Sequence, residues 1–209
     1  GSTDGTAELA RAAGARVVSL PRSGLGAAVR AGLAAAAELD PVAVAFCDAD
    51  GEYAPEELAG MVRPILAGTA DYVVGSRFAG DIRRMLPHRR FGNRALTWAL
   101  ARIAGAAITD GQSGYRALSA EAARAATIIH DYNYAQVLTL DLLARGFRYS
   151  EVPISYAFRE HGRSFVRLVP YLAHVVPAVW RQRRVLVLHD VRAEALPRVG
   201  PRPRVESPA

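Results

Sequence analysis

The sequence has 209 residues, of which 51% are hydrophobic and 22% charged, as in an ordinary globular domain. This length suits one domain with a substantial core. The formal net charge of +6 favours anionic partners such as nucleotides, phosphates, nucleic acids or an acidic lipid surface, without choosing among them. A single cysteine, Cys47, excludes a disulfide framework within the chain and suits a reducing compartment. We predict no transmembrane helix and no signal peptide.

The first half of the chain alternates between helical and extended patterns. Helices are predicted over residues 7–13, 27–38 and 55–67, and strands over residues 15–20, 42–47 and 71–75. The run from Val42 to Cys47 is continuously apolar, which is typical of a strand buried on both faces. The alternation indicates an α/β domain with a largely parallel sheet, and such sheets bind ligands at the carboxyl ends of their strands.

The second half is less regular. Helices are predicted over residues 121–127 and 134–145, and a strand over residues 149–158. The apolar stretch from Ala95 to Ile108 follows a cluster of arginines and is too short to span a bilayer. We therefore expect a main domain over residues 1–164, an amphipathic segment over 165–188 and a disordered, Pro/Arg-rich tail over 189–209.

Acidic residues follow directly after the apolar run. Asp48 and Asp50 stand one residue apart at the predicted strand end, and Glu52 is placed to add a third carboxylate. Mg²⁺ and Mn²⁺ prefer oxygen ligands and accept substrate phosphates as co-ligands. Arg77 follows the next strand at the same edge of the sheet, where a cation can neutralise phosphate charge. The alternative is that the acids are solvated turn residues and that Arg77 is an ordinary surface arginine.

Several short motifs occur in a definite order along the chain. They are CDADGE over residues 47–52, GSRF over 75–78, DGQSGYR over 110–116 and EVPISY over 151–156, followed by Arg159 and Ser164. Together they resemble family-2 glycosyltransferases of the polyprenol-phosphate mannosyltransferase type, which are dolichol-phosphate-mannose-synthase-like. The opening GSTDGT also resembles a segment of that family. The resemblance covers roughly residues 1–185.

The resemblance implies a GT-A fold, with a mostly parallel sheet flanked by helices, and makes residues 1–164 its catalytic domain. It also implies that this chain lacks the first two strands of that fold. The implied reaction is inverting transfer of a sugar from a GDP- or UDP-linked nucleotide-diphospho-sugar to a polyprenyl phosphate. Mg²⁺ or Mn²⁺ is the implied cofactor.

The same resemblance assigns roles to individual residues. Metal ligation falls to Asp50 and Glu52, and Asp110 is the catalytic residue beside the reacting centre. Contacts to the donor nucleotide are implied for Asp4, Asp48 and Arg77. Contacts to the acceptor or to phosphates are implied for Arg90, Asn93, Arg116, Arg159 and Ser164.

Other functions stay open at this stage. The acceptor is alternatively a glycan or small molecule, or the chain is an inactive fragment that acts as a binding module. Nucleic-acid binding is not favoured, because no motif combines aromatic and basic residues. The apolar stretches Ala95–Ile108 and Phe165–Trp180 carry flanking arginines, so each either lies in a bilayer interface or packs as a core helix. We expect a cytoplasmic protein bound peripherally to the inner face of the membrane.

Overall fold

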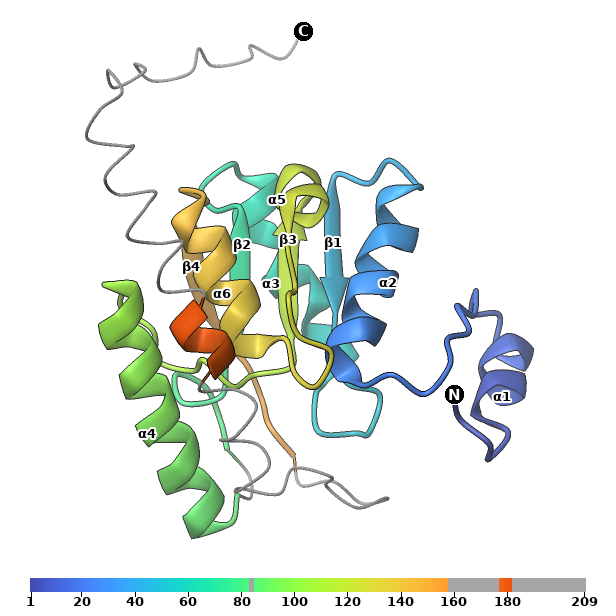
Figure 1. Cartoon of the computed structure of the whole chain (residues 1–209), viewed down its shortest axis with the longest axis horizontal. Helices are drawn as coiled ribbons and strands as arrows, with labels where there is room; N and C mark the ends of the chain where they lie inside the picture. Colours follow the sequence, from blue (N-terminus) through green and yellow to red (C-terminus); the bar gives the residue numbers. More distant parts are fainter. Residues whose placement is uncertain (83–84, 158–176, 182–209) are drawn as a thin grey trace, which may run out of the picture.

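The computed structural model describes residues 1–82, 85–157 and 177–181 (Figure 1). In chain order its elements are α1 (Thr6–Ala12), α2 (Leu25–Ala37), β1 (Ala43–Phe46), η1 (Pro55–Glu57), α3 (Leu58–Leu66), β2 (Tyr72–Ser76), α4 (Pro87–Ala104), β3 (Arg116–Ser119), α5 (Ala120–Ala125), α6 (Ala135–Ala144) and β4 (Tyr149–Pro153). All five predicted helices form within two residues of their expected bounds, and the one predicted over 55–67 opens with the 3₁₀ turn η1.

The four strands form one mixed sheet in the order β1-β3-β2-β4. Strands β1, β2 and β4 run in one direction, because β2 pairs in parallel with β4 and both β1 and β2 pair antiparallel with β3. The predicted parallel orientation therefore holds for β1, β2 and β4. The reversed strand β3, which the sequence did not reveal, lies between β1 and β2.

The strand predicted over residues 15–20 is wrong. These residues have no ladder partner in the described part of the chain, and Val18 is half exposed. The amino group of Gly1 donates to the carbonyl of Leu20 at 2.7 Å, and this segment lies with α1 to one side of the sheet (Figure 1). A short extended segment needs a neighbouring strand to satisfy its backbone groups, so an apolar pattern alone does not make it a strand.

Burial follows the position of each strand in the sheet. All five residues of β2 are buried, as befits a strand with neighbours on both sides. Strand β1, predicted to be buried on both faces, is an edge strand in the described sheet, and Val44 is its one buried residue. The predicted strand over 149–158 forms as β4 and ends at Pro153, while residue 158 lies outside the described residues.

Helices cover both faces of the sheet. On one face α3 packs Met61 and Ile65, which are four residues apart on one side of the helix, against Val73 of β2. On the other face α2, α5 and α6 surround Leu118 of β3, and Leu138 of α6 is fully buried there. In the described part of the chain no helix combines the length and apolar character that crossing a bilayer requires.

The strand directions bring distant segments to one edge of the sheet. Strands β1 and β2 both end there, so residues 47–52 and 76–79 leave the sheet at the same edge. Strand β3 runs the opposite way between them, and its first residue, Arg116, is paired with Phe46 of β1 and Val74 of β2. The segment over 110–115 therefore arrives at this edge from the other direction.

Candidate active site

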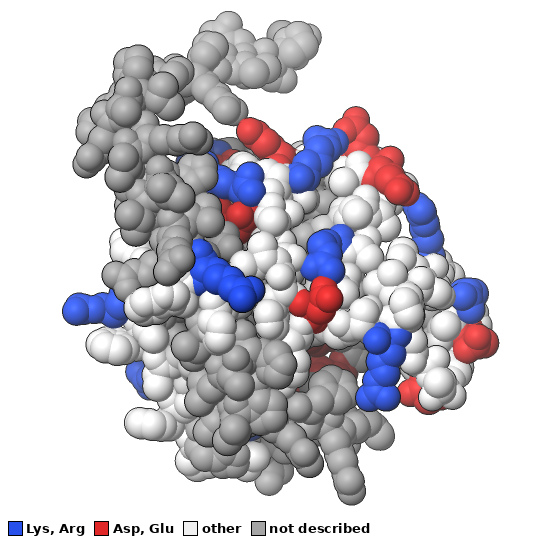
Figure 2. Space-filling model, viewed as in Figure 1, with Lys and Arg blue, Asp and Glu red and all other residues white. Residues whose placement is uncertain are grey.

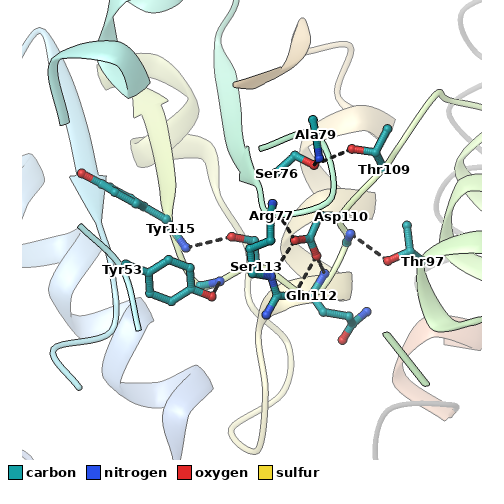
Figure 3. Close-up of polar contacts among 12 residues, drawn as sticks. Tyr53, Ser76, Arg77, Ala79, Thr97, Thr109, Asp110, Gln112, Ser113 and Tyr115 are labelled. Carbon is teal, nitrogen blue, oxygen red and sulfur yellow. Dashed lines mark hydrogen bonds and ion pairs between the residues drawn. The ribbon is translucent and has the colours of Figure 1, made fainter. Parts of the chain in front are cut away.

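Arg77 and Asp110 form a buried ion pair at this edge (Figure 3). The Arg77 guanidinium donates to both carboxylate oxygens, at 2.6 Å from Nε and 2.8 Å from Nη2, and the Arg77 amide adds a third bond at 3.1 Å. Arg77 is 5% exposed and Asp110 0%. Burial opposes the charge on Arg77, but the hydrogen bonds and negative charge of Asp110 favour it, and the net effect raises the pKa of Arg77. The two side chains thus hold each other and tie the end of β2 to the loop over 110–115.

A second set of hydrogen bonds fixes the start of this loop. The Glu151 carboxylate on β4 accepts the amides of Thr109 and Asp110, at 2.8 and 3.2 Å, and the Thr109 hydroxyl. The Gly111 amide donates to Thr97 Oγ1 of α4 at 3.0 Å (Figure 3). Sequence reasoning assigned no role to Glu151, although it opens the EVPISY motif. Its place shows that this motif supports the loop from the neighbouring strand.

Asp48 lies directly against the same loop at Gly114. A Cβ atom on Gly114 would lie 2.5 Å from Asp48 Oδ2 and 3.2 Å from Tyr53 Cε2. The Gly114 amide donates to the Tyr53 hydroxyl at 2.7 Å, and burial raises the pKa of Tyr53, so the phenol keeps its proton. The absent side chain of Gly114 therefore allows the loop to approach the Asp48 carboxylate closely.

Replacing Gly114 with alanine should lower the free energy of unfolding by about 1–3 kcal/mol, because the added methyl group must displace the Asp48 carboxylate. Gly32→Ala is the matched control, since a Cβ there meets no atom within 4 Å and alanine favours a helix interior. Urea denaturation of both variants measures the difference. Equal stability of Gly114→Ala and the unaltered protein would contradict the close approach.

The metal-ligand roles predicted for Asp50 and Glu52 stay predictions. Asp50 Oδ1 accepts the Glu52 amide at 3.1 Å, which orders the turn, whereas the buried Glu52 carboxylate lies 3.9 Å from Arg89 of α4. Among the described residues, no three or more His, Cys, Asp or Glu side chains are grouped so that they could hold a metal ion. The carboxylates of Asp48 and Asp50 supply oxygen atoms, the ligand type that Mg²⁺ prefers.

Arg116 lies in the interior beneath the loop rather than at its surface. It is 0% exposed, and its guanidinium donates to the carbonyls of Ser113, Gly111 and Ala135, at 3.0, 3.2 and 3.0 Å. Further bonds reach the hydroxyls of Tyr72 and Thr139. This arrangement makes Arg116 a tie between the loop and α6, and its predicted contact with a phosphate stays a prediction.

The remaining predicted residues lie apart from this cluster or outside the described residues. Asp4 is exposed on the N-terminal segment, which stands with α1 to one side of the sheet (Figure 1). Arg90 and Asn93 lie on α4, where Arg90 is exposed and Asn93 half-buried. Arg159 and Ser164 fall in the undescribed stretch. The sheet edge therefore unites Asp48, Asp50, Arg77 and Asp110, but not Asp4.

Comparison with solved structures assigns the chain to a class of protein, the GT-A glycosyltransferases. Glucosyl-3-phosphoglycerate synthase from Mycobacterium tuberculosis, in complex with Mn²⁺, UDP-glucose and phosphoglyceric acid, matches with a TM-score of 0.66 and 25% sequence identity. The match covers 88% of this chain and 66% of that one. The family profile described as glycosyl transferase family 2 matches residues 1–124, and the chain belongs to this family.

Curated relatives indicate which kind of family-2 glycosyltransferase the chain resembles. Glycosyltransferase AglJ from Haloferax volcanii is 38% identical over 165 residues, which are 78% of this chain and 53% of that protein. The polyprenol monophosphomannose synthase of Mycolicibacterium smegmatis is 36% identical over 178 residues, with shares of 78% and 66%. The dolichyl-phosphate hexose transferase of Haloferax volcanii is 33% identical over 165 residues, with shares of 76% and 68%.

The chain thus spans about half the length of AglJ and about two thirds of the other two relatives. These matches confirm the GT-A fold and the predicted resemblance to family-2 glycosyltransferases of the polyprenol-phosphate type.

Proposed function

We propose that this protein transfers a sugar from a nucleotide-diphospho-sugar to a polyprenyl phosphate, with inversion at the anomeric carbon and with a divalent metal ion. The observation that carries the proposal is the convergence of three segments at one sheet edge: the Asp48–Asp50 turn, the Arg77–Asp110 pair and the loop over 110–115. Relatives named for transfer to polyprenyl or dolichyl phosphate support the acceptor.

The donor end of the site is the turn after β1. We assign Asp50 to the metal and Asp48 to the donor, with Mg²⁺ or Mn²⁺ favoured because a structural neighbour was crystallised with Mn²⁺ and UDP-glucose. When bound, the cation stabilises the charge that develops on the leaving nucleotide. The Glu52 carboxylate lies 3.9 Å from the Arg89 guanidinium, and its predicted metal contact is kept as part of the proposal. UDP is the first donor nucleotide to test and GDP the second.

The Arg77–Asp110 pair favours a phosphate acceptor over a hydroxyl acceptor. A hydroxyl must lose its proton to a base, and both carboxylate oxygens of Asp110 are already taken up by Arg77. A lipid phosphate is an anion near neutral pH and needs no such base. We assign Asp110 the role of holding Arg77 and the loop over 110–115 beside the reacting centre.

A small phosphorylated molecule is the second candidate acceptor. The neighbouring glucosyl-3-phosphoglycerate synthase was crystallised with phosphoglyceric acid, so a GT-A enzyme of similar structure takes a soluble phosphate compound. Radiolabelled sugar transfer to a short-chain polyprenyl phosphate, compared with transfer to phosphoglyceric acid, separates the two acceptors. Incorporation into the soluble compound alone would contradict the lipid acceptor.

Metal-dependent nucleotide binding tests the donor site. Isothermal titration of the full chain with UDP and GDP, each with and without Mn²⁺, should give binding that requires the metal. Asp50→Ala should weaken this binding at least tenfold, which corresponds to about 1.4 kcal/mol, because the cation loses its carboxylate ligand. Glu56→Ala is the matched control, since this exposed acid lies in η1 outside the turn. Absence of nucleotide binding by the folded chain would support the alternative of an inactive binding module.

A further inference from the structure

Within the described residues, helix α4 packs against the core through the side that carries Thr97 and Leu100. Its Leu100 is 2% exposed and belongs to a core cluster with Ile108 and with Leu140 of α6. Thr97, also buried, receives the Gly111 amide of the site loop. These contacts fix the orientation of the helix relative to the candidate active site.

Beside this buried side, α4 carries a row of exposed aromatic and cationic side chains. Phe91 is 78% exposed and Trp98 66%, and both are large apolar side chains that ordinarily seek burial. Exposed arginines occupy the positions around them at spacings of three or four residues, which place them on the same side of a helix. We call this row the α4 stripe; it consists of Arg90, Phe91, Arg94, Trp98 and Arg102.

The charge of α4 has one sign. Residues 87–104 contain four arginines and no aspartate or glutamate. The flank of the molecule where α4 lies, at the left of Figure 2, shows blue and white described residues and no red ones. The Arg102 guanidinium lies 5.8 Å from the Trp98 ring centroid, and that of Arg94 lies 5.6 Å from the Phe78 ring. Each cation thus stays close to apolar surface, as arginine does at a membrane interface.

We propose that the α4 stripe docks the protein on an anionic lipid surface. Phe91 and Trp98 enter the headgroup region, where aromatic rings are favoured, and the three arginines meet lipid phosphates. A second copy of the chain is a poorer partner, because a symmetric contact would bring two sets of arginines face to face. This inference deepens the proposed function and rests on it for the purpose of docking: Arg90 and Asn93, predicted to contact the acceptor phosphate, lie on the same helix.

Sedimentation with lipid vesicles tests the stripe directly. The full chain is mixed with vesicles of phosphatidylcholine alone or with phosphatidylglycerol, without any polyprenyl phosphate, so that docking is measured apart from catalysis. We expect binding to the anionic vesicles, roughly tenfold weaker in Phe91→Ser/Trp98→Ser and roughly fivefold weaker in Arg94→Glu. Leu66→Ser and Arg63→Glu are the matched controls, because both residues are exposed on α3, and they should bind as the unaltered protein does.

Three results would overturn the proposal. The first is equal binding of the stripe variants and the controls, and the second is no preference of the unaltered chain for anionic vesicles. The third is a dimer, detected by light scattering, that Phe91→Ser/Trp98→Ser abolishes. Transfer to a water-soluble, short-chain polyprenyl phosphate keeps the two hypotheses separate. In the unaltered chain, transfer without binding to anionic vesicles would sink the docking surface alone, and vesicle binding without transfer would sink the proposed function alone.

Discussion

Replacing Arg77 with alanine is expected to lower the free energy of unfolding by about 3–5 kcal/mol, because it leaves the Asp110 carboxylate buried without its guanidinium partner. Arg124→Ala is the matched control. Its partner Asp40 is 95% exposed in its side chain, so breaking that pair should cost less than about 1 kcal/mol. Urea denaturation followed by circular dichroism measures both.

The double variant Arg77→Ala/Asp110→Ala measures how much of the lost stability comes from leaving one buried charge without its partner. It should be less destabilised than the sum of the two single variants, since removing both groups leaves no unpaired buried charge. If Arg77→Ala proves as mild as Arg124→Ala, the two residues do not depend on each other in solution. Arg77 would then be available for the donor phosphates, as the sequence motif predicted.

Arg116→Met should destabilise the protein by about 3 kcal/mol or more. Methionine keeps much of the shape but leaves the buried carbonyls of Ser113, Gly111 and Ala135 without donors, and each such loss costs about 1–3 kcal/mol. Arg116→Lys should not restore full stability, because an ammonium group lacks the planar fork that reaches separate acceptors. Thermal and urea denaturation provide the measurement.

Arg63→Met on the surface of α3 controls for the change of residue type and should alter stability by less than about 0.5 kcal/mol. One outcome for Arg116→Met would favour the phosphate contact that the family resemblance implied for Arg116. If Arg116→Met unfolds like the unaltered protein but no longer binds the acceptor phosphate, the side chain must reach substrate in solution, and the structural role is wrong.

The position of the site was predictable because strand ends carry a strong signal. The apolar run before Asp48 and the strand before Arg77 were both predicted to end at the same edge of the sheet. The helix between these two strands indicated that they run in the same direction. The orientation of β3 was not predictable in this way. Its four residues, Arg116–Ser119, follow a polar segment and have no apolar run that would mark a strand or its direction.

The groups that the charged residues contact could not be predicted from the sequence either. Arg77 and Asp110 are 33 residues apart, and nothing in either motif indicates that they neutralise each other. The family resemblance implied a phosphate contact for Arg116, and arginine is seldom fully buried, yet the fold encloses this side chain. A motif reveals that a charge is needed, whereas only the packing reveals which groups surround it.

Because β3 lies between β1 and β2, the candidate site depends on the pairing of all three strands. The Asp48 turn, Arg77 and the loop over 110–115 meet only when these three strands are paired, so no local segment can assemble the site alone. A nucleotide that binds there should therefore be thermodynamically linked to folding. At 100 times its dissociation constant it would add about 2.7 kcal/mol to the stability of the domain.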